Sequence, residues 1–330
     1  MNLGFWQKLK RPFFVLAPMA DVTDAAFRRI IAKYGKPDVF WTEFVSADGL
    51  CSPAGREKLL IDLSYTEAER PIVAQLFSSK PENMREAAKL VAELGFDGLD
   101  INMGCPDRTI EKQGAGAALI KDFKLAQDVI RAAEEGSGLP VSIKTRVGYG
   151  KDILEEWLSA LLETKPAAIT VHARTRKEMS KTPANWEAVA RAVKLRNSCQ
   201  GVALTRTLII GNGDVKDLAD AKEKARETSA DGIMLGRAIF GNPFLFRNKN
   251  VLSEVEGPYT PSVEEKLRVM VEHTKLFEEL FKDKKNFSVM KKHYKAYVNG
   301  FDGAKELRME LMDAKNADEA EGIANRFLKL

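Results

Sequence analysis

Cysteine and histidine are both scarce in this chain of 330 residues, which contains three of each. Cys51, Cys105 and Cys199 lie far apart, and none belongs to a Cys-x-x-Cys pair, so neither a disulfide framework nor a structural zinc site is expected. Long apolar runs are missing as well, since no segment approaches the ~18 consecutive apolar residues typical of a membrane span. We therefore expect a cytoplasmic protein that has no metal and no membrane partner. We also expect a monomer.

The chain also lacks a strong excess of one charge sign. Lysine and arginine number 51 against 47 aspartate and glutamate residues, which gives a net charge of +4. This mild excess neither requires nor excludes a nucleic-acid partner, so only the positions of the cations can indicate whether nucleic acid binds. Hydrophobic residues make up 45% of the chain, which is enough for one large core and a smaller appended unit.

Short apolar segments alternate with amphipathic helical patterns through roughly the first 240 residues. The predicted strands are 13–17, 39–45, 72–77, 99–103, 141–147, 168–171, 208–210 and 233–235. We expect Thr23 to cap the first helix and Gly35 to end it, and Asp122 and Gly136 to bound the helix after the fourth strand. Strands this short and this uniformly apolar are typical of parallel sheets that are buried on both faces.

Eight such units favour an α/β fold, a closed (β/α)8 TIM barrel. An open doubly wound sheet is the alternative, but no Gly-x-Gly-x-x-Gly turn follows the first strand. The alternation ends near 251–261, and only helical patterns follow. We therefore predict a barrel domain over 1–250 and a small all-helical domain over 251–330, whose first helix begins with a capping box of Ser262 and Glu265.

Polar side chains follow several of the predicted strands, at the end that forms the reactive face of such a barrel. A buried lysine or glutamine there can simply satisfy neighbours inside the barrel, and a single histidine is more often structural. Donors from several strands at one end nevertheless favour a site, because each buried polar group costs about 1 to 3 kcal/mol if it is left unpaired. The candidates are Pro18, Met19, Ala20, Gln75, Asn102, Cys105, Lys144, Arg146, His172 and Arg174.

Cys105 is the candidate that the local sequence holds most rigidly. Pro106 fixes its own φ and favours extended geometry at Cys105, so the thiol stands at a strand end instead of on a flexible loop. Gly114 and Gly116 then allow the returning backbone to approach closely. The alternative is a small buried side chain that is chemically inert.

Glycine-rich turns follow the last two predicted strands. The segments 210–214 and 235–242 read Ile-Gly-Asn-Gly-Asp and Leu-Gly-Arg-Ala-Ile-Phe-Gly-Asn. Loops at these two places form the usual phosphate cradle of the barrel, and Arg237 would add a fixed positive charge.

Taken in chain order, these motifs resemble the tRNA-dihydrouridine synthases. The resemblance spans the barrel and extends into the helical tail. It is carried by the segments 17–24 (Ala-Pro-Met-Ala-Asp-Val-Thr-Asp), 100–106 (Asp-Ile-Asn-Met-Gly-Cys-Pro), 114–117, 144–146, 171–176 (Val-His-Ala-Arg-Thr-Arg), 185–187, 211–214, 236–237, 290–294 and 300–304.

The resemblance implies a flavoprotein with FMN at the barrel mouth. It also implies reduction of the C5–C6 double bond of specific tRNA uridines, with a hydride from reduced FMN reaching C6 and NADPH or NADH as the reductant. Cys105 would be the general acid that protonates C5, a task that suits a thiol whose ordinary pKa keeps it protonated at neutral pH. The implied FMN-binding residues are Pro18, Met19, Ala20, Gln75, Lys144, His172, Asn212, Gly213, Asp214, Gly236 and Arg237.

A lysine-rich stretch in the tail is the candidate tRNA-binding surface. Residues 282–296 contain six lysines against one aspartate, a pattern that can also mark a solvated helix face. With the resemblance, Lys291, Lys292, His293, Lys295 and Arg308 are candidate phosphate contacts, and Asn102, Arg146, Arg174 and Arg176 are candidates nearer the flipped base.

Two other functions remain open at this stage. One is an FMN-dependent barrel that acts on a small pyrimidine, in the manner of dihydroorotate dehydrogenase, and the other is an RNA-binding protein without redox chemistry. The segment 194–207 is longer and more basic than usual for the resembled family, and we expect it at the end of the barrel away from the mouth.

Overall fold

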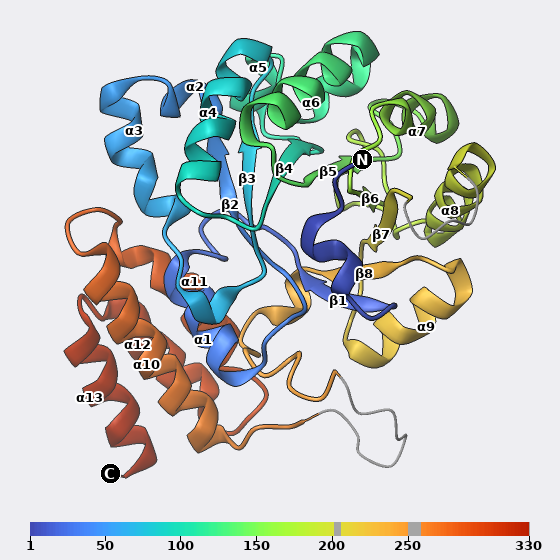
Figure 1. The fold of residues 1–330 in the computed structure, drawn as a ribbon. Helices are drawn as coiled ribbons and strands as arrows, with labels where there is room; N and C mark the ends of the chain where they lie inside the picture. The colour runs from blue at the N-terminus through green and yellow to red at the C-terminus, as the bar shows by residue number, and fades with distance from the viewer. Residues whose placement is uncertain (201–205, 250–258, 330) are drawn as a thin grey trace.

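The computed structural model describes residues 1–200, 206–249 and 259–329. Eight strands form one sheet of parallel neighbours in the order β1-β8-β7-β6-β5-β4-β3-β2 (Figure 1). The outer strands are joined by backbone hydrogen bonds from Asp38 N to Phe14 O at 2.9 Å and from Leu16 N to Val39 O at 3.5 Å. The predicted (β/α)8 barrel is therefore confirmed. Its strands are β1 Phe13–Leu16, β2 Phe40–Ser46, β3 Ile72–Phe77, β4 Gly98–Met103, β5 Val141–Arg146, β6 Ala168–His172, β7 Leu208–Asn212 and β8 Gly232–Leu235.

Helices surround the barrel and bury their apolar faces against the strands. They are α1 Ala25–Tyr34, α2 Ala47–Leu50, α3 Pro53–Leu59, α4 Pro81–Glu93, α5 Arg108–Lys112, α6 Phe123–Ser137, α7 Leu154–Glu163, α8 Trp186–Gln200 and α9 Leu218–Thr228. Short 3-10 helices are η1 Gly4–Lys8, η2 Leu60–Leu63, η3 Glu67–Glu69, η4 Gly116–Lys121, η5 Arg237–Ile239 and η6 Phe287–Val289. None of the helices in the described ranges has the length and apolar character required to cross a membrane.

Two predicted helix boundaries are wrong by one or two residues. Asp24, not Thr23, caps α1 by accepting a hydrogen bond of 2.9 Å from Phe27 N, because Thr23 Oγ1 accepts from Met19 N in the turn after β1. Gly138, not Gly136, ends α6, since Gly138 adopts the left-handed conformation at φ +62°. Gly136 lies within α6, where a Cβ would be 2.2 Å from Arg85 O.

The N-terminal end of the barrel is closed by aromatic side chains. Trp6, from η1, is buried against Trp41 of β2 with 5.9 Å between ring centroids, and against Phe13 of β1 at 5.7 Å. The same apolar cluster includes interior residues of several strands. Among the described residues, this packing blocks the N-terminal end and leaves the C-terminal ends of the strands as the side for a ligand.

The tail is helical, as predicted. Its helices are α10 Val263–Phe281, α11 Met290–Tyr297, α12 Ala304–Asp313 and α13 Ala317–Leu328. Ser262 Oγ accepts a hydrogen bond of 3.1 Å from Glu265 N, whereas the Glu265 carboxylate accepts one from the Tyr259 hydroxyl, so one half of the predicted capping box is present. The predicted domain boundary at 250/251 lies outside the described residues.

The tail packs closely on the barrel, with α10 beside α1 (Figure 1). Phe27 of α1 lies against His273 and His293, with ring centroids 4.9 and 5.0 Å apart. Lys285 is half-buried and pairs with Glu43 of β2 at 3.0 Å and with Asp62 of η2 at 2.7 Å. These contacts fix the tail to the barrel through buried surface.

The segment 194–207 lies at the end of the barrel away from the mouth, in the part that the structure describes. The helix α8 continues to Gln200, so the first part of this segment is helical. Arg196 is fully buried and pairs at 2.7 Å with Asp231, which immediately precedes β8. Residues 201–205 lie outside the described ranges.

Candidate active site at the barrel mouth

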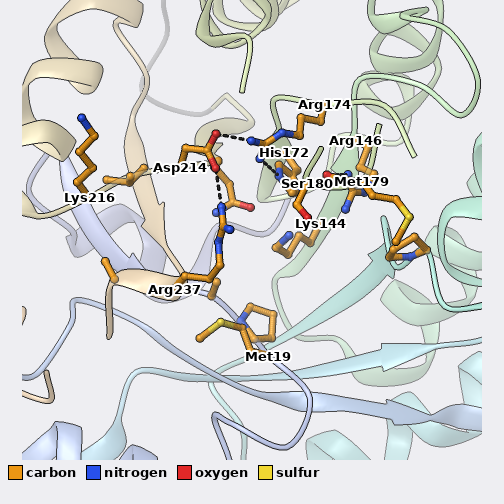
Figure 2. A pocket seen from close by; sticks show the side chains of 18 residues that line it. Met19, Lys144, Arg146, His172, Arg174, Met179, Ser180, Asp214, Lys216 and Arg237 are labelled. Carbon is orange, nitrogen blue, oxygen red and sulfur yellow. Dashed lines mark hydrogen bonds and ion pairs between the residues drawn. The ribbon is translucent and has the colours of Figure 1, made fainter. Parts of the chain in front are cut away.

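A cavity of about 580 Å³ opens at the C-terminal ends of β1 and β5 to β8 (Figure 2). The structure brings together in its wall nine of the eleven residues predicted to bind FMN, and also two residues predicted to contact the base, Arg146 and Arg174. The nine are Pro18, Met19, Lys144, His172, Asn212, Gly213, Asp214, Gly236 and Arg237. Ligand sites in proteins have volumes of this order.

Positive charge dominates the wall of this cavity. Burial and the neighbouring Arg146 lower the pKa of Lys144 to about 8, and burial lowers the pKa of Arg146 to about 10. Burial and the charges of Lys144, Arg146, Arg174 and Arg237 lower the pKa of His172 well below its ordinary value. His172 is therefore a neutral imidazole at pH 7, and the wall attracts an anion.

Asp214 lies between two of these cations, as Figure 2 shows. Its carboxylate pairs with Arg174, accepts a hydrogen bond of 2.6 Å from Arg237 Nη2 and one of 3.0 Å from Ala184 N. Burial acts to raise the pKa of Asp214, but these donors outweigh it and hold the pKa below its ordinary value.. Asp214 thus orients two arginines, and its own charge would repel a phosphate.

Cys105 follows β4 beside the cavity and is half-buried. Its backbone N–H donates to Asn102 Oδ1 at 2.9 Å, and its carbonyl accepts from Ala117 N at 3.0 Å. Burial raises the pKa of the thiol, although the charges of Lys144 and Arg146 oppose this effect. Pro106, the next residue, lines the cavity. Cys105 is therefore a protonated thiol at neutral pH.

Two arginines predicted to contact RNA connect the loop after β4 to the loop after β6. Arg146 Nε donates to Gly104 O at 2.8 Å, and its Nη1 donates to Thr175 O at 3.1 Å. Arg176 Nη2 donates to Pro106 O at 3.3 Å and pairs with Glu111 of α5. Much of their donor capacity is used within the protein, and Arg176 is not part of the cavity wall.

Three predicted residues occupy different surroundings from those expected. Gln75 is fully buried, with both ends of its amide bonded inside the barrel, and Ala20 is exposed outside the cavity wall. Asn102 is 6% exposed, and its amide oxygen accepts the N–H groups of Gly104 and Cys105. Gln75 and Asn102 are therefore buried behind the residues that line the cavity.

The tail places a cation, Lys292, beside the loop after β1 at the mouth. Lys292 Nζ lies 3.5 Å from Asp21, in the loop after β1. Lys295 is exposed, and Lys291 and Arg308 are partly exposed. His293 is fully buried against Phe27, so the prediction that it contacts a phosphate is wrong. The helical period turns this residue of α11 toward the barrel.

Sequence reasoning missed some residues of the cavity wall. Met179 and Ser180 come from the loop after β6, and Lys216 follows β7. Lys216 could have been found, because it lies two residues beyond Asp214 in a loop at the reactive end of a strand. No local sequence pattern predicts that the loop after β6 reaches the cavity wall.

Comparisons with known proteins show the family to which this chain belongs. The family model described as "Dihydrouridine synthase (Dus)" matches residues 15–329. This chain belongs to the dihydrouridine synthase family. Among curated proteins, the "Probable tRNA-dihydrouridine synthase 2" of Bacillus subtilis is 42% identical over 99% of this chain and 97% of its own length. The "Probable tRNA-dihydrouridine synthase" of Staphylococcus aureus is 39% identical over 99% and 96%.

Solved structures of lower sequence similarity share the barrel of this dihydrouridine synthase family member. The old yellow enzyme from Trypanosoma cruzi has a TM-score of 0.54 at 12% identity, with 81% of this chain and 94% of that chain covered. Histamine dehydrogenase from Rhizobium sp. 4-9 has a TM-score of 0.53 at 13% identity, and the match covers 80% of this chain and 49% of that longer chain. At these identities the likeness concerns the fold.

Proposed function

We propose that this protein reduces the C5–C6 double bond of specific uridines in tRNA to give dihydrouridine. The observation that carries the proposal is the protonated thiol of Cys105 at the edge of a cationic cavity, in a barrel of the dihydrouridine synthase family. The names of the similar proteins from Bacillus subtilis and Staphylococcus aureus support tRNA as the substrate.

The residues of the cavity fit FMN as the cofactor. Pro18 and Met19 offer apolar surface for a ring system, and Lys144, Arg174 and Arg237 offer cations for anionic groups. Gly213, at φ +132°, has a backbone conformation that favours glycine, and a Cβ there would be 2.8 Å from Ala184 Cβ. This donor set matches a ligand with a flat ring and a phosphate.

Bound FMN would supply a hydride to C6 of the uracil, with NADPH or NADH as the source of electrons. Cys105 then gives its proton to C5, so that one hydride and one proton saturate the double bond. The buried surroundings of the thiol suit this role, because they keep the proton on sulfur until C5 of the uracil is ready to accept it. A cationic wall also favours negative charge that develops in the uracil ring before protonation.

The tail supplies a surface for the tRNA backbone. Lys291, Lys295 and Arg308 are at least partly exposed, and Lys292 lies beside the loop after β1, at the mouth. A uridine must leave its stack to enter the cavity, and cations beside the entrance hold the flanking phosphates while it does so.

Mapping of dihydrouridine in tRNA from cells with and without this protein tests the proposal. We expect loss of dihydrouridine at defined positions, and restoration when the purified protein is added with NADPH or NADH. Reduction of free pyrimidines without any change in tRNA would instead favour the small-molecule oxidoreductase. A colourless protein that binds tRNA would favour an RNA-binding role.

A further inference from the structure

A buried carboxylate that takes no part in the proposed chemistry lies inside the barrel. Asp100, on β4, has no solvent exposure and is not part of the cavity wall. Its Oδ1 accepts a hydrogen bond of 2.5 Å from Ser142 Oγ, and its Oδ2 accepts one of 2.7 Å from Gln75 Nε2. Burial raises the pKa of Asp100 to about 6, so the group is charged at neutral pH. A buried charge imposes an orientation on the groups that donate to it.

The constraint extends through two amides to the backbone of Cys105. Because Gln75 Nε2 donates to Asp100, Gln75 Oε1 faces Asn102 and accepts a hydrogen bond of 3.2 Å from its Nδ2. Asn102 Oδ1 then accepts the N–H groups of Gly104 at 3.1 Å and Cys105 at 2.9 Å. A carboxylate only accepts and a backbone N–H only donates, so both ends of this chain of bonds require the same orientation of the two amides.

We propose that Asp100 is a positioning residue for Cys105, and that it acts through Gln75 and Asn102. The proposal rests on the proposed function for the role of the thiol, whereas the hydrogen-bond chain is independent of it. The Cys105 peptide is also held from its carbonyl side, where a Cβ on Gly116, at φ +61°, would be 2.9 Å from Cys105 O. A displacement of about 1 Å at a reacting group can lower a rate about 100-fold.

Coupling between positions 100 and 102 is measurable at pH 8, where Asp100 is ionised. In Asn102→Asp, a carboxylate lies at each end of the Gln75 amide. The Gln75 amide can donate only from Nε2, so one of the two carboxylates receives no hydrogen bond from it. In Asp100→Asn/Asn102→Asp, both side-chain hydrogen bonds of Gln75 reverse their direction. The new carboxylate at position 102 still accepts the N–H groups of Gly104 and Cys105. We expect Asn102→Asp to lower the midpoint of urea unfolding and the double variant to recover it. Additive losses would overturn the proposal.

The effect on Cys105 itself is measured by hydrogen exchange of the Gly104 and Cys105 amides in the full chain. Asp100→Ala removes the acceptor for Gln75, so we expect about tenfold faster exchange at these amides and a kcat about tenfold lower with KM for tRNA unchanged. Asp100→Asn can still accept from Gln75 and should restore both values. Ser142→Ala is the matched control, because it removes the other hydrogen bond to the same carboxylate.

Equal exchange in Asp100→Ala and Ser142→Ala would show that Asp100 does not position Cys105, even if the wild-type protein makes dihydrouridine. Faster exchange in Asp100→Ala alone would support the positioning role even if no dihydrouridine were made, in which case the proposed function fails. Should Asp100→Ala not fold, the comparison of Asn102→Asp with the double variant tests whether Asp100 and Asn102 are coupled.

Discussion

The two sides of the barrel mouth hold their functional groups in different ways. On the side of β3 and β4, Cys105 is fixed by amide hydrogen bonds that end on the buried Asp100. On the side of β5 to β8, Lys144, Arg174 and Arg237 surround the cavity, and ion pairs with Asp214 orient the two arginines.

In the proposed function, this difference separates two chemical tasks, proton donation and anion binding. At Cys105, burial outweighs the opposing charges of Lys144 and Arg146, so the pKa of the thiol is raised and the thiol keeps its proton. On the opposite side, burial and the cations of the wall lower the pKa of His172, and these cations attract anions. A less buried thiol beside the same cations would ionise more readily and would be a poorer proton donor. The predictions below test each side in turn, together with the tail.

The largest effect is expected on the side of β4. Cys105→Ala should lower dihydrouridine formation at least about 100-fold, the usual contribution of a positioned general acid, while flavin absorbance and tRNA affinity remain. Single-turnover reduction of tRNA measures this loss. Cys51→Ala is the control and should keep full activity, because Cys51 follows β2 and bonds to Asn83 O. An active Cys105→Ala variant would show that another group protonates C5.

The next effect concerns the cationic wall. Arg237→Met removes a charge that Asp214 orients, so FMN affinity should fall about tenfold or more, as expected for a lost hydrogen bond to a charged group. Titration of the apoprotein with FMN, followed by quenching of flavin fluorescence, gives this value. Arg268→Met, on α10, is the control and should bind FMN like the wild type. Unchanged affinity in Arg237→Met would place the phosphate elsewhere.

A moderate effect is expected from the tail. Replacement of Lys291, Lys295 and Arg308 by glutamine should weaken tRNA binding about tenfold and reduce its dependence on salt, because fewer counterions are released. We expect KM to rise while kcat changes little. Glutamine at Lys89, Lys194 and Arg226, at other places on the barrel, removes the same charge and is the control. Equal losses in both triple variants would indicate a general effect of charge.

The smallest effect concerns packing between tail and barrel. Burial lowers the pKa of His293 to about 3, and its ring nitrogens have no hydrogen-bond partner among the described residues. The unfolded chain binds a proton near pH 6.5, so His293 lowers stability as the pH falls below that value, by about 1.4 kcal/mol at pH 5.5. His293→Phe should remove this loss and change stability little at pH 7.

Urea unfolding of the wild type and His293→Phe at pH 7.0 and pH 5.5 measures the difference. Titrating groups that do not contact His293 are common to both proteins and cancel in the comparison. His273 contacts His293, but burial is the main cause of its lowered pKa in either protein. The same pH dependence in both would mean that His293 binds its proton as readily in the folded state as in the unfolded chain.

Much of the fold was predictable, because its signals are local. The alternation of apolar strands with amphipathic helices predicted the barrel, and Pro106 predicted a rigid corner at Cys105. Helix ends were less certain where two candidates stood close together, as with Thr23 and Asp24. Which of the two residues caps α1 depended on which side chain the preceding turn had already engaged in a hydrogen bond.

The roles of individual polar residues were harder to predict. The motif order indicated a site at the strand ends, and most of the residues expected to bind FMN meet in one cavity. The burial of Gln75 and His293 could not be predicted, since it depends on how β3 and α11 pack against other elements. Arg176 carries a charge typical of RNA contacts, yet it pairs with Glu111, 65 residues earlier in the chain.

The sequence by itself determined which residues can do chemistry here and at which strand ends they stand, because strand order and motif spacing are properties of the chain. Only the tertiary structure decided which of them face the cavity, which are buried behind it and which charges neutralise one another. Those outcomes depend on contacts between residues far apart in sequence, and such contacts exist only after the strands have closed into a barrel.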